Sequence, residues 1–420
     1  MKRAGALLAL VTIGVGLAIV WAAYGAADDP KTAVVKPTAP AAVIDASKFP
    51  SLQAAFDAVP ESGGLVKLPP GDFRIEKPLV LSRGNTRVEG AGAATRLINC
   101  NQQGEPAMII RGAKPKARLW RVQVADFRIS GDPNAVDGKS TKPKGGDGLL
   151  VENVDEFYAH GMSVDHNGGH GIHLLNCVED PRVADSILTY NAKAGLNIFG
   201  SHDIVVNANH FEENQDALRC ADSFNLCMNG NNLDDHLRDG VVIENTYGSV
   251  LSGNMIEECN GLAVVLDREC YGITISANVI ADNFGGGVDL RGAWGCAVSA
   301  NTFTITAVRA LRVGPKSGRI TITGNNFSDS FIGPKCKRKA EANRATGVFL
   351  EGTSDITVTG NIFSGLSTEA IHADAACRRI LISANVMTDL NRDRQGKGKS
   401  IELGGAKEVV ESQNLLDQPK

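Results

Sequence analysis

The chain has few aromatic residues, no strong excess of charge and no recognisable metal-binding spacing. Phe, Trp and Tyr make up 5% of its 420 residues, so a core must be built mainly from aliphatic side chains. The formal net charge of −4 does not identify a class of partner, and we predict no nucleic-acid partner. Neither a Cys-x-x-Cys pair nor a His-rich spacing occurs, which excludes the common zinc-binding patterns.

What the chain does contain is a short repeated motif of alternating apolar residues, a small residue and a turn residue. Consecutive turn positions are mostly 23 or 24 residues apart. A fixed period in this range is typical of a solenoid. The unit holds short strand-like runs and no helical period, so a stack of β-coils is predicted. The nine turn residues are Gly161, Asp185, Asn209, Asn254, Asn278, Asn301, Asn325, Asn361 and Asn385.

Each coil is predicted to contain three strands. Asn adopts the left-handed backbone conformation more readily than most non-glycine residues, so it is expected to turn one strand into the next. Stacked coils would also let each Asn amide bond the Asn above and below it. Because apolar and polar residues alternate, one face of each strand would point into a narrow core. About eleven coils are expected from the repeat.

The N-terminus predicts export. Lys2 and Arg3 precede a long apolar run, followed by small residues, so residues 1–27 are predicted to be a secretory signal or an uncleaved membrane anchor. Residues 28–46 are rich in Ala and Pro and predict a linker, which leaves 47–420 as one β-helix domain. The protein is therefore expected in the periplasm, outside the cell or at the cell surface, as a monomer.

The chain holds nine cysteines, and an exported protein could use them in disulfides. Cys177, Cys270 and Cys377 each lie eight residues before the turn residue of their coil, which places them in one column on coils that are not neighbours. They are therefore predicted to be buried free thiols. Cys220 and Cys227 are close in sequence and form the best candidate disulfide.

The N-terminal part of the domain carries a family resemblance. Residues 50–58 (PSLQAAFDA) predict a short amphipathic helix that caps the open end of the solenoid. With the following GGLVKLPPGDFRI and VEGAGAATRLI, this segment resembles the pectate-lyase-like right-handed parallel β-helix superfamily over roughly residues 47–415. The resemblance implies an all-β, single-stranded right-handed parallel β-helix. This superfamily contains lyases, hydrolases, epimerases and non-catalytic proteins, so the reaction stays open.

Motifs that would specify the reaction are only partly present. GGHGIH (168–173) contains the Gly-His-Gly of polygalacturonases. The Asn-Thr-Asp, Asp-Asp and Arg-Ile-Lys motifs that accompany it in that family do not occur, and neither does the Asp-Pro-His of alginate epimerases. We therefore interpret His170 as a chance histidine at a Gly-rich corner.

Three intervals between turn residues are longer than one coil, and in each of them the additional residues precede the third strand. The predicted insertions are 131–147, 215–239 and 328–346, and they would line one side of the rod as walls of a groove. The first and third are basic and the second is acidic. Their charged residues are Lys139, Lys142, Lys144, Lys335, Lys337, Arg338, Lys339 and Arg344 on the basic walls and Asp216, Asp222, Asp234, Asp235, His236, Arg238 and Asp239 on the acidic wall.

Aligned third strands place two rows of side chains in this groove. Neighbouring coils would bring Glu244, Asp267 and Arg291 within roughly 5 Å of one another. Two carboxylates so close would share a proton or hold a cation such as Ca²⁺. The predicted catalytic residues are Glu244, Asp267, Asp289 and Arg291, the predicted substrate-binding residues are His173, Asn197, Arg268 and Arg312, and the predicted Ca²⁺ ligands are Glu244 and Asp267. Ordinary cross-strand ion pairs would give the same pattern.

The sequence thus favours an exported enzyme acting on a polysaccharide, with a uronic-acid polymer as the expected substrate. β-Elimination is the expected reaction, and hydrolysis and C5 epimerisation remain open. The alternative is a non-catalytic β-helix that binds glycan or has a structural role at the cell surface, tethered through an uncleaved N-terminus.

Overall fold

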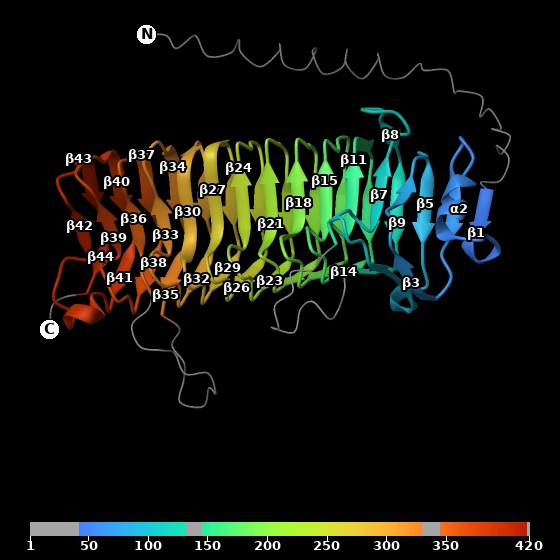
Figure 1. Cartoon of the computed structure of the whole chain (residues 1–420). Coiled ribbons are helices and arrows are strands. Elements are labelled where there is room, and N and C mark those ends of the chain that lie inside the picture. Colours follow the sequence, from blue (N-terminus) through green and yellow to red (C-terminus); the bar gives the residue numbers. More distant parts are fainter. Residues whose placement is uncertain (1–41, 132–144, 330–344, 418–420) are drawn as a thin grey trace, which may run out of the picture. The chain divides into compact units, whose positions relative to one another are not determined.

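The computed structural model describes residues 42–131, 145–329 and 345–417. Its strands form a 28-stranded sheet, a 14-stranded sheet and a small two-stranded pair, and all named pairings are parallel (Figure 1). The large sheet consists of two ladders, here called the first and third ladders, and the 14-stranded sheet is the second ladder. Each coil contributes one strand to each ladder. The predicted all-β parallel β-helix is therefore confirmed, with more coils than the eleven expected.

The first ladder precedes the Asn corner of each coil. Its strands are β1 (Ala42–Asp45), β2 (Gly64–Lys67), β5 (Thr86–Glu89), β9 (Val122–Ala125), β13 (Tyr158–His160), β16 (Arg182–Ala184), β19 (Val205–Asn207), β22 (Cys227–Asn229), β25 (Val250–Ser252), β28 (Thr274–Ser276), β31 (Ala297–Ser299), β34 (Gly318–Thr323), β37 (Ser354–Thr359), β40 (Arg378–Ser383) and β43 (Lys407–Ser412).

The second ladder follows the Asn corner. Its strands are β3 (Gly71–Ile75), β6 (Thr95–Asn99), β10 (Arg128–Ser130), β14 (Ser163–Asp165), β17 (Ile187–Thr189), β20 (His210–Glu212), β23 (Asn232–Asp234), β26 (Met255–Glu257), β29 (Val279–Ala281), β32 (Thr302–Thr304), β35 (Asn326–Ser328), β38 (Ile362–Ser364), β41 (Val386–Thr388) and β44 (Leu415–Leu416).

The third ladder completes each coil. Its strands are β4 (Leu79–Leu81), β7 (Met108–Arg111), β11 (Leu149–Glu152), β15 (Ile172–Leu175), β18 (Ala194–Phe199), β21 (Asp216–Ala221), β24 (Val241–Glu244), β27 (Leu262–Tyr271), β30 (Gly286–Trp294), β33 (Leu311–Val313), β36 (Val348–Leu350), β39 (Ile371–Ala373) and β42 (Ile401–Leu403). Outside the ladders, β8 (Leu119–Trp120) pairs with β12 (Val154–Asp155).

The Asn corner is built differently from the prediction. The left-handed residue is the small residue before the Asn, as at Ala208, Ala277 and Ala300 with φ of 56°, 54° and 55°. The Asn itself is buried, and its Oδ1 accepts from the main-chain and side-chain amides of the preceding coil's Asn, for example from Asn278 to Asn301 at 3.0 Å each. The predicted amide ladder is confirmed, but its role is to satisfy buried amides rather than to supply the positive φ.

The gap between Asn209 and Asn254 contains a complete coil that the sequence analysis missed. Asn231 is its corner residue and bonds both neighbours in the Asn ladder. Strands β21, β22 and β23 belong to this coil, so the predicted acidic insertion 215–239 is wrong. Its carboxylates are spread around the coil instead of forming a wall. The charged residues of the two predicted basic walls lie outside the described residues, between β10 and β11 and between β35 and β36.

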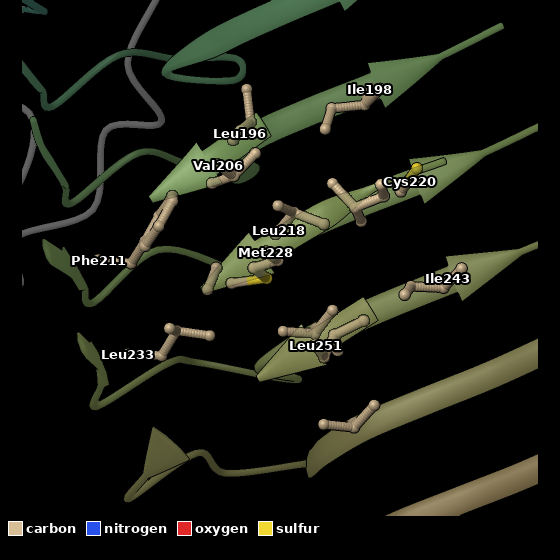
Figure 2. Close-up of a cluster of buried hydrophobic side chains, with 14 of the residues drawn as sticks. Leu196, Ile198, Val206, Phe211, Leu218, Cys220, Met228, Leu233, Ile243 and Leu251 are labelled. Carbon is tan, nitrogen blue, oxygen red and sulfur yellow. The ribbon is translucent and has the colours of Figure 1, made fainter. Parts of the chain in front are cut away.

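Equivalent apolar positions stack along the axis to form the core. In Figure 2, Val206, Met228 and Leu251 follow one another on successive coils, and Phe211 is followed by Leu233. All five side chains are fully buried. Phe303, Phe327 and Phe363 stack in the same way farther along, with ring centroids 4.6 and 4.8 Å apart. The few aromatic residues are thus compatible with a continuous core.

The N-terminal cap is as predicted. Helix α2 (Leu52–Asp57) buries Leu52 and Phe56, and Gln53 fixes it to the first coils by two hydrogen bonds to the main chain of Val80, at 2.8 and 3.0 Å. The fold begins at β1, inside the segment predicted as linker. Residues 1–27 lie outside the described residues. Among the described residues, no helix is long and apolar enough to cross a bilayer.

The cysteines of the described residues are free thiols. The predicted Cys220–Cys227 disulfide is wrong, because Cys220 faces the core from β21 and Cys227 is exposed on β22 of the next ladder. The buried column is confirmed. The thiols of Cys177, Cys270 and Cys377 each donate to a carbonyl one coil earlier, at 3.3–3.4 Å, and burial raises the pKa of Cys177 to about 12 and that of Cys270 to about 11.

Candidate functional site

The outward side of the third ladder, here called the polar face, carries the two predicted rows. The register confirms their alignment, since Glu244 is paired with Asp267, Asp267 with Arg291 and Asp289 with Arg312. The missed coil adds one member to each row. The first row includes His173, Asn197, Arg219, Val242, Val265, Asp289, Arg312, Phe349, His372 and Glu402, and the second row includes Leu175, Phe199, Ala221, Glu244, Asp267, Arg291, Glu351 and Asp374.

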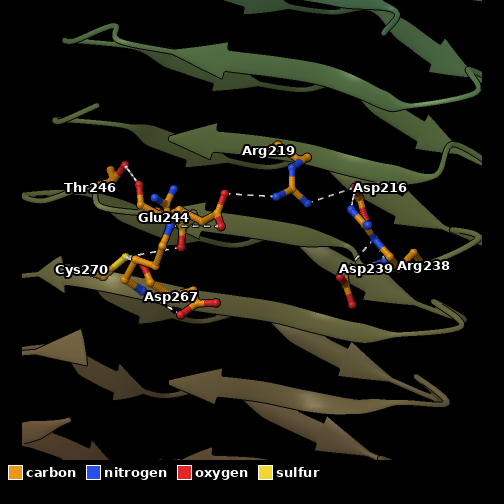
Figure 3. A network of polar contacts seen from close by, with 10 residues as sticks. Asp216, Arg219, Arg238, Asp239, Glu244, Thr246, Asp267 and Cys270 are labelled. Carbon is orange, nitrogen blue, oxygen red and sulfur yellow. Dashed lines mark hydrogen bonds and ion pairs between the residues drawn. The ribbon is translucent and has the colours of Figure 1, made fainter. Parts of the chain in front are cut away.

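Glu244 does not face Asp267 as a carboxylate pair. One Glu244 oxygen accepts from Arg219 at 3.1 Å, and the other lies 3.4 Å from Arg268 (Figure 3). Asp267 accepts a hydrogen bond from the main-chain N–H of Arg268 at 2.8 Å. With both of its oxygens next to guanidinium groups, Glu244 is poorly placed to share a proton or to hold Ca²⁺. The predicted catalytic and metal roles of this pair stay predictions.

Asp289 is the centre of a second ion network. Its carboxylate is only 5% exposed, and it accepts from Arg291 at 2.7 Å and from Arg312 at 3.0 Å. Arg312 also donates to Glu351 at 2.8 Å. Arg291 lies beside Asp267 in the register, as predicted, but its guanidinium turns back to Asp289 on its own strand. A carboxylate closed in by two arginines is more suited to holding shape than to acid–base catalysis.

The middle of the polar face is also less open than predicted. Val242 and Val265 point outward in the first row but are only 5% and 3% exposed. The charged side chains at this position are joined in ion pairs around Glu244 and Asp289.

The N-terminal end of the face is different. His173 Nδ1 lies 3.0 Å from a carboxylate oxygen of Asp147, and the main-chain N–H of His170 donates to the other oxygen at 2.7 Å. The two imidazole rings lie 5.3 Å apart, edge to face. Asp147 fixes His173 as the Nδ1–H tautomer, and no described residue bonds Nε2, which is left as an acceptor at the surface.

The electrostatics of this end keep its groups in defined protonation states. Burial disfavours the charged form of Asp147, but the hydrogen bonds from the His173 side chain and the main-chain N–H of His170 help to hold the pKa of Asp147 below its ordinary value. Burial lowers the pKa of His170 to about 4, against the attraction of Asp147. Asp147 is therefore ionised and His170 neutral at neutral pH, with Nδ1 of His170 accepting from Ala194 N at 3.2 Å. The Gly-His-Gly histidine is thus part of a built cluster rather than a chance residue.

Arg219 completes the site, two coils beyond His173 in the first row. Figure 3 shows its guanidinium between Asp216 and Glu244, at 3.4 and 3.1 Å. Asp216 is fully buried and also paired with Arg238. Asn197 occupies the coil between His173 and Arg219. The sequence analysis missed Arg219 because it treated its coil as an insertion; recognising Asn231 as a corner would have placed Arg219 in the row.

One group of carboxylates among the described residues has the spacing of a metal site. Ligand atoms of Asp234, Asp235 and Glu258 lie within 4.8 Å of one another. These residues lie at the end of second-ladder strands β23 and β26, on another side of the coil from the polar face. A Ca²⁺ requirement at the polar face remains a prediction.

The fold has relatives among known proteins. The family model described as "Right handed beta helix region" matches residues 147–303. The A-module of the Azotobacter vinelandii mannuronan C-5 epimerase AlgE6 is 16% identical, with 88% of this chain and 94% of that chain covered and a TM-score of 0.56. DFA-IIIase from Arthrobacter chlorophenolicus A6, solved without its lid, is 14% identical, with coverages of 88% and 98% and a TM-score of 0.51.

Tailspike protein 2 of the Escherichia coli O157:H7 bacteriophage CAB120 is 12% identical, with 84% of this chain and 43% of that chain covered and a TM-score of 0.53. No curated protein sequence matches the chain. At these identities the likeness concerns the fold. The chain has the right-handed parallel β-helix fold, as its sequence motifs predict, and no particular family is indicated.

Proposed function

We propose that the protein is a carbohydrate-active enzyme that removes the C5 proton from a uronic-acid residue of a polysaccharide. The observation that carries this proposal is the His173–Asp147 pair with Arg219 farther along the same row. A histidine oriented by a carboxylate, with its second nitrogen open to the surface, is a suitable general base. A structural relative named a mannuronan C-5 epimerase adds support for this class of substrate.

The proposed chemistry needs both a base and a cation. The C5 proton becomes acidic only when the charge of the adjacent carboxylate is neutralised, and Arg219 would do this as charge develops. His173 Nε2 would accept the C5 proton. The resulting anion then either expels the C4 oxygen, which leaves a 4,5-unsaturated uronate, or takes a proton back on the opposite face, which gives the epimer. Asn197 lies between the two groups and would hydrogen-bond the same sugar.

The test is an assay of the purified protein on pectate, alginate and a neutral glucan, with and without Ca²⁺. Ultraviolet absorbance detects unsaturated uronates, proton NMR detects epimers, and reducing ends without either product indicate hydrolysis. His173→Gln should abolish the reaction. His210→Gln is the matched control, because His210 also pairs with a carboxylate, Glu212 at 3.3 Å, but on the second ladder. Equal loss in both variants, or hydrolysis alone, would refute the proposal.

A non-catalytic glycan-binding role at the cell surface is the second candidate. It is favoured by the closed ion pairs around Asp289, which resemble a structural surface. Binding of a polysaccharide without turnover under every condition would support it. Export through residues 1–27 is proposed for either role, and cell fractionation of the full-length chain would test it.

A further inference from the structure

Five ring-bearing residues form a row at the corner between the third and first ladders. Each lies on the next coil and is bridged in parallel to its neighbour. Only 5% of the chain is Phe, Trp or Tyr, so a continuous row outside the core is notable. Here called the ring row, it consists of His202, Phe224, Tyr247, Tyr271 and Trp294.

The ring row has two parts with different geometry. His202, Phe224 and Tyr247 stack face to face, with centroids 4.7 and 5.1 Å apart and planes within 9°. Within the stack, the face of each ring lies against its neighbour. These three rings make an ordinary stacked ladder that stabilises the corner.

Tyr271 and Trp294 instead lie on glycines of the following coil. A Cβ on Gly295, whose φ is +60°, would have three consecutive atoms of the Tyr271 ring at 3.3–3.8 Å, so the face of the ring rests there. A Cβ on Gly318 would lie only 2.7 Å from Cζ3 of Trp294. Both positions must therefore be glycine for the rings to lie against the backbone.

With glycine backbone beside them, both rings remain partly exposed. Tyr271 is 57% exposed and Trp294 37% exposed. The Arg319 guanidinium lies over the Trp294 ring at 5.9 Å. Hydrogen bonds from Arg379 and Ser354 lower the pKa of Asp355 to about 2, and the charge of Arg319 adds to this. The result is a row of two partly exposed rings on neighbouring coils, with charged groups at one end.

We infer that Tyr271 and Trp294 form a glycan-binding platform separate from the polar face. The apolar C–H faces of pyranose rings stack on flat aromatic rings, while Arg319 and Asp355 can bond sugar hydroxyls at the edge. The platform is only one side chain wide, so it cannot bury the roughly 800 Å² per partner of a stable protein interface. The strands beside it are already paired within their ladders, so it offers no edge to an added strand.

This inference goes beyond the proposed function and does not depend on it. The platform holds no general base, and its role is to keep the protein on a polysaccharide chain. A catalytically dead protein would still bind through it. The same surface would also serve the non-catalytic alternative.

The experiment is affinity electrophoresis and tryptophan fluorescence titration of the full chain with pectate, alginate and hydroxyethylcellulose. The test variant is Tyr271→Ala/Trp294→Ala. The matched control is Trp120→Ala, because Trp120 is also exposed, at 42%, and also carries an arginine over its ring, Arg121 at 5.8 Å. His173→Gln serves as the variant altered only at the polar face. Far-ultraviolet circular dichroism confirms that each variant is folded.

The platform predicts that at least one polysaccharide retards the unaltered protein and the Trp120→Ala variant equally, and that it still retards His173→Gln. The double variant should bind that polysaccharide at least about tenfold more weakly, and the fluorescence change on binding should disappear with Trp294. Equal binding by the double variant would overturn the inference. So would loss of binding in Trp120→Ala to the same extent, or the absence of binding to all three polymers.

Discussion

The two ends of the polar face use similar residues in opposite ways. Around Asp289, each carboxylate oxygen has an arginine donor and the network is closed. Around Asp147, the carboxylate orients His173 and leaves the second imidazole nitrogen open. Asp147 lies just before β11 and Asp289 lies on β30, so the two carboxylates belong to separate coils, and both are largely shielded from solvent. What separates them is whether the partner keeps a hydrogen-bonding atom that is free toward solvent, as His173 does at Nε2.

The difference teaches that charge density alone does not locate chemistry on a regular scaffold. A β-helix places side chains at a fixed spacing, so opposite charges on successive coils pair readily and neutralise one another. A catalytic group needs a partner that orients it and leaves its reactive atom free. By this criterion the N-terminal end is the functional one and the Asp289 end is structural.

The largest expected effect is a loss of activity in Asp147→Asn, and this variant tests the comparison directly. An amide can hold the imidazole in the wrong tautomer and cannot stabilise its protonated form, so turnover should fall by about 10²–10⁴-fold. The pH–rate profile should shift as well, because Asp147 acts through His173 as a positioning residue. Steady-state kinetics across pH checks this. A fall in affinity with unchanged turnover would mean that Asp147 only shapes the binding surface.

The next effect concerns stability at the other end. Asp289→Asn leaves Arg291 and Arg312 without their shared carboxylate and should lower the free energy of unfolding by about 2 kcal/mol. Activity per folded molecule should change little. Denaturant titration checks the first outcome, and the assay checks the second.

The control for that variant is Asp355→Asn. Asp355 also pairs with an arginine, Arg379 at 2.6 Å, but the pair is largely exposed, and exposed pairs add little to stability. If Asp289→Asn lost turnover and lowered the free energy of unfolding no more than Asp355→Asn does, the Asp289 network would be functional rather than structural.

Much of the fold could be predicted because it depends on local periodicity. The spacing of corners such as Asn278 and Asn301 sets the coil, and alternation sets which side chains face inward, so the register of Glu244, Asp267 and Arg291 was predictable. The corner at Asn231 was missed although its segment, LCMNGNNL, fits the repeat, because the gap of 45 residues was interpreted as one long insertion. Without that coil, Arg219 had no place in the row.

The site was less predictable than the register. Which carboxylate Arg291 chooses depends on side-chain rotamers, and it turned to Asp289 at 2.7 Å instead of Asp267. The Asp147–His173 contact joins residues on adjacent coils through a position just before the strand, outside the two rows that alternation defines. Likewise, the left-handed residue of each corner could not be told from the Asn beside it by composition alone.

A third prediction uses pH to compare the site with the core. Burial lowers the pKa of His170 and of His236 to about 4 each, whereas an unfolded histidine titrates near 6.5. Between these values the unfolded chain binds the extra protons, so stability should fall as pH decreases from about 6.5 toward 4. Each histidine should contribute about 1–2 kcal/mol at pH 5 relative to pH 8.

Denaturant midpoints at several pH values measure this loss. His170→Gln and His236→Asn should each flatten the profile in that window. Asp147 acts separately, because its lowered pKa means that its contribution is retained above pH 3.8 and lost only at lower pH. A profile that stays steep between pH 6.5 and 4 in the doubly substituted protein would show that other groups control acid sensitivity.

The smallest expected effect is a gain in stability at the core position. His236 occupies the column of Asn191 and Asn214, whose amides bond from coil to coil, but its Nε2 is buried without a hydrogen-bond partner. His236→Asn would extend the amide ladder and remove an unsatisfied polar atom, so the free energy of unfolding at neutral pH should rise by about 1 kcal/mol. The reverse exchange, Asn283→His, should lower it. If His236→Asn were destabilising at neutral pH, the volume of the imidazole would matter more to this corner than its missing hydrogen bond.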